Sequence, residues 1–136
     1  MRPPEANRAL APDPGSCEDE DGGIARIADA INQANAEAPE VMCVLENMAG
    51  QGHCIGSRFE QLAKIIERVK DPTGVGVCLD TCHMFAAGYD VRTAESFGRV
   101  MDDFERIVGG KFLVAMHLND SKGDLGSRLC VPLSIP

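Results

Sequence analysis

The chain has 136 residues and a formal net charge of −8, with 21 acidic and 13 basic side chains. This length fits one modest domain and falls well short of the roughly 250 residues of a complete eight-stranded α/β barrel. The acidic balance argues against a general polyanion-binding surface, because nucleic-acid-binding domains usually carry a basic face. We therefore expect any contact with DNA to be local and metal-assisted.

The cysteines and the apolar runs bear on the compartment. No secretory signal precedes the six cysteines, and two of them lie in predicted buried strands, so reduced thiols are expected. No apolar stretch approaches the roughly 20 residues that a membrane span requires. These features predict an intracellular protein without a membrane segment, nuclear in a eukaryote or cytoplasmic in a bacterium.

The first part of the chain divides into a leader and a helix. Residues 1–22 contain four prolines and then an acidic run, without a periodic apolar pattern, which predicts a disordered leader. From Ile24 the apolar residues recur at helical spacing, and Pro39 ends the pattern. This segment is predicted to be a helix that precedes the first strand.

Three apolar runs, V-M-C-V-L-E, V-G-V-C-L-D and F-L-V-A-M-H, are predicted to be parallel strands buried on both faces. Ser57 and Glu60 form a predicted capping box that opens a second helix, and a third helix is predicted to begin at Thr93. Residues 47–56, 84–90 and 119–128 are predicted loops. The strands are spaced like strand–loop–helix units, which predicts an α/β fold, a partial TIM barrel over residues 23–128. Residues 129–136 are predicted to be an irregular tail.

Each predicted strand ends in a residue that can bind a metal ion. The three strands close on Glu46, Asp80 and His117, and His83 follows Asp80 by one helical turn. Because the carboxyl ends of parallel strands lie on one side of a barrel, these side chains are predicted to converge. Two imidazoles and two carboxylates suit a divalent transition metal, here zinc or manganese. Cys82 lies between two of these residues and is predicted to be a buried structural thiol.

Three longer sequence motifs resemble those of a known protein family. They are L-E-N-M-A-G-Q-G at residues 45–52, C-L-D-T-C-H-M-F-A-A-G-Y-D at 78–90 and M-H-L-N-D-S-K at 116–122, followed by G-S-R at 126–128. In order and spacing they resemble the endonuclease IV family, the apurinic/apyrimidinic (AP) endonucleases of base-excision repair. The resemblance runs from about Pro14 to Arg128. It implies a xylose isomerase-like TIM barrel, of which this chain carries about three βα units of the second half.

The resemblance also implies a chemistry and assigns roles. The family hydrolyses the phosphodiester on the 5′ side of an abasic site with three zinc ions, which activate the attacking water and neutralise charge on the phosphate. Glu46 matches the bridging glutamate of the zinc cluster and is the predicted catalytic residue. Asp80 and His117 match ligands of one zinc ion, and His83 matches a ligand of another.

At two sequence motifs this chain differs from the family pattern. Asp13 replaces the histidine of an H-P-G-S word, and an aspartate oxygen can also bind zinc, so Asp13 is either a replacement ligand or an ordinary loop residue. After G-S-R the family has an Asp-x-His pair, whereas this chain has Leu129-Cys130-Val131-Pro132. The resemblance therefore implies an incomplete three-zinc site, which a missing barrel half or self-association would have to complete.

Abasic DNA is the partner that the resemblance implies. Gln51, Tyr89, Lys122 and Arg128 lie in the predicted loops and are candidate phosphate or sugar contacts, although each could be an ordinary surface residue. Two alternatives stay open: a sugar isomerase or epimerase of the same barrel superfamily, and an inactive truncated product. The A-G-Q-G and N-D-S-K words favour the nuclease.

Overall fold

The structure is a computed structural model that describes residues 19–131. The predictions on residues 1–18, including Asp13, and on residues 132–136 lie outside this range. The elements follow in the order α1 (Glu20–Glu37), β1 (Cys43–Glu46), α2 (Phe59–Glu67), η1 (Pro72–Gly74), β2 (Val75–Asp80), α3 (Thr81–Ala87), α4 (Ala94–Ile107), η2 (Gly110–Phe112) and β3 (Leu113–His117). No helix in the described range is long and apolar enough to cross a membrane.

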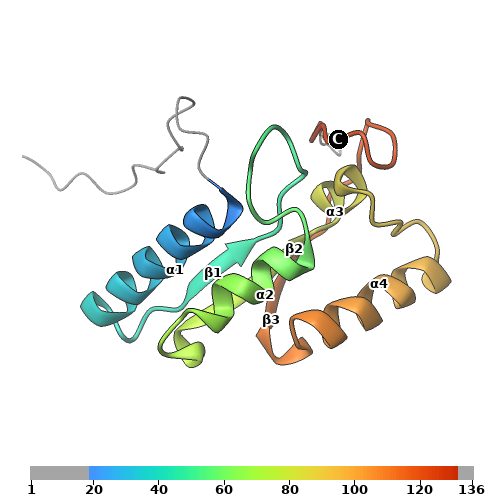
Figure 1. Cartoon of the computed structure of the whole chain (residues 1–136). Coiled ribbons are helices and arrows are strands. Elements are labelled where there is room, and N and C mark those ends of the chain that lie inside the picture. Colours follow the sequence, from blue (N-terminus) through green and yellow to red (C-terminus); the bar gives the residue numbers. More distant parts are fainter. Residues whose placement is uncertain (1–18, 132–136) are drawn as a thin grey trace, which may run out of the picture.

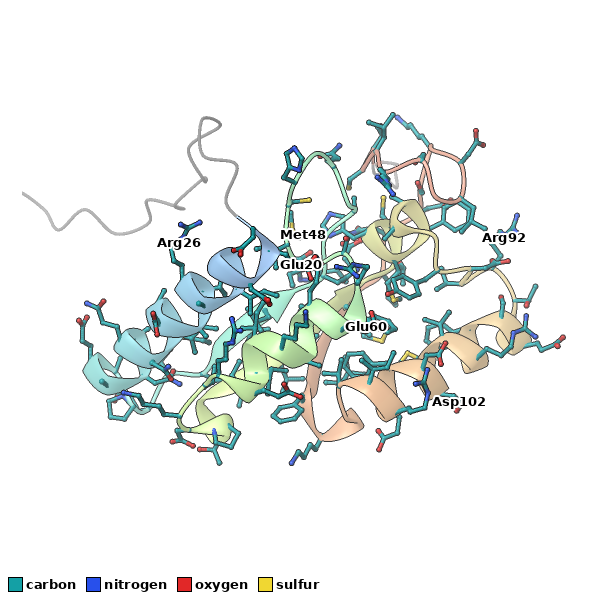
Figure 2. The ribbon with its side chains drawn as sticks, viewed as in Figure 1. Glu20, Arg26, Met48, Glu60, Arg92 and Asp102 are labelled. Atoms are coloured by element: carbon teal, nitrogen blue, oxygen red, sulfur yellow. The ribbon has the colours of Figure 1, made fainter. Side chains whose placement is uncertain are left out.

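The three strands form one parallel sheet in the order β1-β2-β3, which confirms the predicted strands and the α/β class. Glu46 is level with Cys78, and Asp80 is level with His117. Helices α1, α2 and α4 lie together on one face of this sheet, as in the outer ring of a barrel (Figure 1). Charged side chains such as Arg26 and Asp102 extend from the outer surfaces of these helices (Figure 2).

The core lies between the helices and the central strand. Val77 and Leu79 of β2 are fully buried together with Phe59 of α2 and Phe104 of α4. The two phenylalanine rings meet edge to face with their centroids 5.3 Å apart, a favourable geometry for aromatic pairs. Burying a side chain of this size stabilises the fold by about 1.5–3 kcal/mol. The position of β2 is therefore fixed by the best packed part of the molecule.

The second face of the sheet is largely uncovered by described residues. Every residue of β2 is buried, but burial alternates along β1, and Val44 and Val114 are 48% and 46% exposed. The prediction that all three strands are buried on both faces is therefore wrong for β1 and β3. In a complete barrel this face would point to the interior, where layers of side chains from other strands fill the space.

Helix α1 begins earlier than predicted. The Asp19 side chain accepts a hydrogen bond of 2.8 Å from the Gly22 backbone N–H and caps the helix, so residues 20–22 are helical and not part of a disordered leader. Glu20 and Asp21 occupy the first turn, where negative charge is favourable near the positive end of the helix dipole. Asp19, Glu20 and Asp21 thus form a helix start.

Helices α2 and α3 also correct the predicted boundaries. Arg58, not Ser57, is the residue before α2, and the Gln61 side chain accepts from the backbone N–H groups of Gly56 and Arg58 at 2.9 and 3.3 Å. The predicted loop 84–90 begins inside α3, which ends at Gly88 with a φ of +106°, a conformation that favours glycine. The predicted start of α4 is confirmed, because Thr93 is its N-cap.

Candidate metal centre

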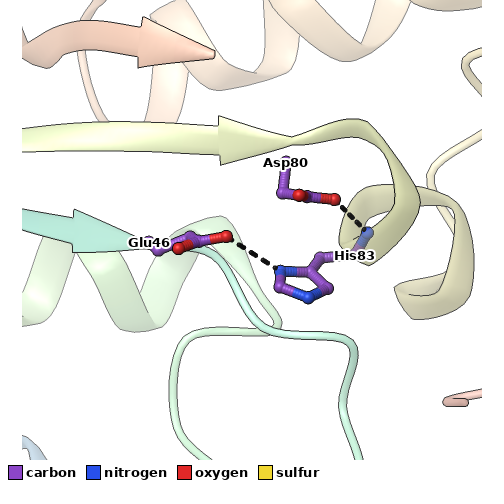
Figure 3. A group of neighbouring side chains, drawn as sticks. All are labelled: Glu46, Asp80 and His83. Atoms are coloured by element: carbon purple, nitrogen blue, oxygen red, sulfur yellow. Dashed lines mark hydrogen bonds and ion pairs between the residues drawn. The ribbon is translucent and has the colours of Figure 1, made fainter. Parts of the chain in front are cut away.

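Glu46, Asp80 and His83 come together at the carboxyl end of the sheet (Figure 3). Glu46 ends β1, Asp80 ends β2, and His83 lies in the first turn of α3. Each residue offers a ligand atom, and these atoms lie within 4.8 Å of one another. Parallel strands bring their ends to one edge, and α3 follows β2 directly, so the local fold places all three groups without a long loop.

His117 joins this group from the end of β3. Its Nδ1 lies 3.3 Å from Glu46 Oε1 and 3.9 Å from Asp80 Oδ2. Glu46 Oε1 also lies 3.3 Å from His83 Nδ1, so one carboxylate oxygen faces both imidazoles. The predicted convergence of Glu46, Asp80, His83 and His117 is therefore what the structure shows.

Hydrogen bonds hold the Asp80 carboxylate in place. Asp80 is 3% exposed, and its Oδ1 accepts from the His83 backbone N–H at 3.0 Å. Its Oδ2 accepts from the Asn119 side chain at 2.5 Å. A buried carboxylate beside a second carboxylate needs nearby positive charge or neutralisation, and within the described range the side chains facing it are histidines and amides. This donor set fits a divalent cation.

Sequence reasoning missed Asn47, which is 2% exposed. Its side-chain Oδ1 accepts from the Asp80 backbone N–H at 2.6 Å, and its Nδ2 donates to the Asp80 carbonyl at 3.4 Å. The Asn47 carbonyl accepts from His83 Nδ1 at 2.8 Å, which leaves the His83 Nε2 lone pair for a metal ion. The sequence signal was a polar residue directly after Glu46, where the buried strand ends.

This geometry was compared with known families and structures. Residues 7–134 match the family described as xylose isomerase-like TIM barrel, AP endonuclease 2. The chain belongs to this family. Family membership explains why three neighbouring strand ends all carry metal-binding side chains, because these barrels place their sites at the carboxyl ends of the strands.

Named relatives agree with this assignment. The chain is 55% identical over 115 residues to apurinic-apyrimidinic endonuclease 1 of Plasmodium berghei, covering 85% of this chain and 22% of the relative. The Plasmodium falciparum protein of the same name is 54% identical over 109 residues, covering 80% and 18%. This chain therefore spans about a fifth of the length of these curated relatives.

Solved structures support the partial barrel. Endonuclease IV from Thermus thermophilus superposes with a TM-score of 0.68 at 41% identity, covering 81% of this chain and 40% of that one. The crystal structure of AsfvAP:AG superposes with a TM-score of 0.54 at 23% identity, covering 70% and 33%, and supports the fold alone. The predicted resemblance to the endonuclease IV family is confirmed, as is a TIM barrel of which this chain forms a part.

The predicted DNA contacts lie in different environments. Gln51 is exposed in the loop that follows β1, and Lys122 and Arg128 are exposed in the loop that follows β3. The Tyr89 ring instead stacks on Phe59 with centroids 4.4 Å apart, and its hydroxyl accepts from the Phe59 backbone N–H at 3.2 Å. Burial raises the pKa of Tyr89. The structure thus accounts for Tyr89 by packing, and a DNA contact there stays a prediction.

Two cysteines lie close to the metal-binding residues, the buried Cys78 and the half-buried Cys130. Burial, followed by the Glu46 charge, raises the pKa of Cys78. Burial also raises the pKa of Cys130 to about 11, and the neighbouring Cys82 sulfur adds to this effect. Burial therefore favours the neutral thiol at both positions.

Proposed function

We propose that this chain supplies metal-binding residues of a zinc-dependent AP endonuclease, which hydrolyses the phosphodiester on the 5′ side of an abasic site. The observation that carries this proposal is the convergence of Glu46, Asp80 and His83, with their ligand atoms within 4.8 Å. The names of the Plasmodium relatives and of the bacterial structure support the substrate.

Histidine nitrogens and carboxylate oxygens are common zinc ligands. Asp80 and His83 would supply a carboxylate oxygen and an imidazole nitrogen to the ion. Backbone groups occupy Asp80 Oδ1 and His83 Nδ1, and the Asn119 side chain donates to Asp80 Oδ2. Glu46 Oε1 lies 3.3 Å from both His83 Nδ1 and His117 Nδ1, and Glu46 would be a ligand shared between ions, as the resemblance implies. When bound, zinc supplies a water of lowered pKa and positive charge for the phosphate.

The chain's own residues position the substrate around this centre. The Lys122 and Arg128 side chains are exposed cations in the loop that follows β3, and Gln51 is exposed in the loop that follows β1. An acidic protein can hold a phosphate where such local cations adjoin a metal ion. We assign these residues to the DNA backbone, with Glu46 as the catalytic carboxylate.

The resemblance implies that a complete zinc site has more ligands than Glu46, Asp80, His83 and His117. We propose that the remaining ligands come from further barrel strands or from a second copy of the chain. Sedimentation of the zinc-loaded protein separates these possibilities, because only self-association makes the molecular mass, and with it the activity, depend on protein concentration.

Elemental analysis of purified protein combined with nicking of a duplex that contains one abasic analogue tests the function. We expect bound zinc and nicking that Glu46→Gln reduces at least a hundredfold, whereas Glu60→Gln on the outer surface of α2 (Figure 2) leaves both unchanged. Bound metal without nicking would overturn the nuclease proposal in favour of a vestigial metal site or of the isomerase or epimerase alternative. Absence of both metal and nicking would also overturn the nuclease proposal, and the chain would then be an inactive truncated product.

A further inference from the structure

The Cys82 and Cys130 sulfur atoms lie 3.7 Å apart, although the residues are 48 positions apart in the sequence. Cys82 is in the first turn of α3 and is 1% exposed, whereas Cys130 is half-buried in an irregular segment. The two atoms are in van der Waals contact, so no third group separates them. A disulfide needs an S–S distance of about 2.05 Å, so the two sulfur atoms must approach each other further on oxidation.

Backbone hydrogen bonds hold Cys130 against α3. Gly126 N–H donates to the Phe85 carbonyl at 3.0 Å, and Arg128 N–H donates to the Ala86 carbonyl at 2.9 Å. Both carbonyls lie in the last turn of α3, and the Phe85 carbonyl also accepts from the Gly88 N–H that caps this helix. The sulfur contact therefore follows from a docked loop, residues 119–131, and does not depend on one flexible side chain.

We propose that Cys82 and Cys130 form a reversible disulfide that fastens loop 119–131 to α3. This modification site stands on the sulfur contact and does not require the proposed nuclease function. Nothing in the contact pattern assigns either thiol a metal-binding role, since Cys82 lies outside the group of Glu46, Asp80 and His83. The pair is adjacent to that group because His83 follows Cys82 directly.

The oxidant that we name is a low-molecular-weight disulfide such as oxidised glutathione. The Cys130 thiol loses its proton and its sulfur attacks one sulfur of the oxidant, which breaks the oxidant's S–S bond and releases one small thiol. Cys82 then loses its proton and attacks the Cys130 sulfur of the mixed disulfide, which releases the second small thiol. The chain loses two protons and two electrons, and the oxidant takes them up and is reduced to two thiols.

Mass spectrometry of the full chain after oxidation, alkylation of free thiols and trypsin digestion tests the proposal. Trypsin places Cys130 in residues 129–136, and Cys78 and Cys82 together in residues 71–92, so fragment spectra must distinguish the last two. We expect a cross-linked peptide joining Cys82 to Cys130. It disappears in Cys130→Ser and persists in the matched control Cys54→Ser, which changes a half-buried cysteine of another loop.

Thermal unfolding gives a second readout. A disulfide that closes a long loop restricts the unfolded chain, so the oxidised protein should unfold several degrees above the reduced protein. This difference should vanish in Cys130→Ser and reverse with reductant. Pairing of Cys130 with Cys78, or alkylation of both thiols after oxidation, would overturn the proposal. Equal protection of both thiols by zinc under reducing conditions would also overturn it, because the pair would then be a metal site.

Discussion

Asn47 joins two strand ends at the metal centre. Its side chain satisfies both backbone groups of Asp80, and its own carbonyl fixes the ring of His83. Hydrogen-bonding partners of metal ligands set the orientation and the tautomer of the ligand, and their loss typically lowers metal affinity 10–100-fold. Asn47 therefore acts on the metal centre through Asp80 and His83.

Asn47→Ala is expected to lower zinc affinity roughly 10–100-fold, because the Asp80 backbone loses both side-chain hydrogen bonds that hold it, whereas the backbone carbonyl of residue 47 still accepts from His83 Nδ1. It should also cost about 1–3 kcal/mol of unfolding free energy, since the buried Asp80 N–H loses its partner. Competition with a chromophoric chelator measures the affinity, and denaturant unfolding of the apoprotein measures the stability.

Asn32→Ala is the matched control for this prediction. Asn32 likewise bridges backbone groups, the Arg68 carbonyl and the Lys70 N–H, but it does so between α1 and the end of α2. It should lower stability without changing zinc affinity. If both variants reduced affinity equally, the effect of Asn47 would be general destabilisation and not positioning.

Among residues 19–131, Arg128 is the only non-glycine residue with a positive φ, at +56°. This left-handed conformation costs a residue with a Cβ about 1–2 kcal/mol, and strained residues of this kind are concentrated at functional sites. Its side chain also lies beside Gly50 of the opposite loop. Arg128 is therefore an exposed cation on the loop that follows β3, beside the loop that follows β1.

Arg128→Ala and Arg128→Gly separate charge from strain. Both variants should weaken binding of abasic duplex and reduce the salt dependence by about one phosphate contact. Arg128→Gly should be the more stable of the two by about 1 kcal/mol, because glycine adopts this conformation freely. Salt-dependent anisotropy titrations and denaturant unfolding measure the two effects. Unchanged DNA affinity in both variants would exclude a phosphate contact.

The contrast between Glu46 and Asn47 shows what can be predicted at this scale. Glu46 was predictable because an apolar run that ends in a carboxylate places that residue at a strand end. Asn47 was not, because its role depends on hydrogen bonds to a residue 33 positions away. A sequence pattern reports burial and direction along one segment, whereas pairing across segments requires the register of the sheet.

At the scale of elements, the strands were predicted better than the helix ends. A continuous apolar run is a strong signal, and β2 is buried along its whole length. Helix starts depend on single hydrogen bonds, such as Asp19 to Gly22 in α1 or Gln61 to Gly56 before α2. Several residues nearby could have made equivalent caps, so the sequence alone did not select one.

The connection between α3 and α4 contains a charged pair that makes a pH-dependent prediction. The Arg92 guanidinium donates to both oxygens of Asp90 at 2.9 Å, and the Arg92 backbone N–H donates at 3.1 Å. These bonds lower the pKa of Asp90 from 3.8 to about 2. Because the folded pKa is the lower one, the pair stabilises fully above about pH 4, and this contribution is lost as the pH falls toward 2.

Arg92→Ala should raise the pKa of Asp90 toward 3.8 but not fully, because the backbone N–H of residue 92 remains a donor. Carboxyl carbon chemical shifts followed by NMR against pH measure this change. Arg99→Ala is the control, since Arg99 pairs with Glu95 and contributes only weakly at Asp90. An equal shift in both variants would indicate general electrostatics and not the Asp90–Arg92 pair.

At the scale of the whole molecule, the sheet is covered on one face. Helices α1, α2 and α4 bury the side of β2 that carries Val77, whereas Met42, Val44 and Val114 are exposed among the described residues. Apolar side chains grouped on an exposed sheet face favour association or dye binding. With the outer edges of β1 and β3 also unpaired in residues 19–131, we expect a low and broad thermal transition.

The double variant Val44→Thr with Val114→Thr tests this interpretation. It should reduce binding of a hydrophobic dye and concentration-dependent sedimentation while leaving the unfolding midpoint nearly unchanged, because both positions are already exposed and threonine retains the β-branched shape. Val77→Thr makes the same chemical change at a position with 0% exposure on the helix-covered face, and it should lower the midpoint clearly. If the double variant destabilised the protein as much as Val77→Thr, other residues would have to cover the second face, and the sheet would be buried on both faces in solution.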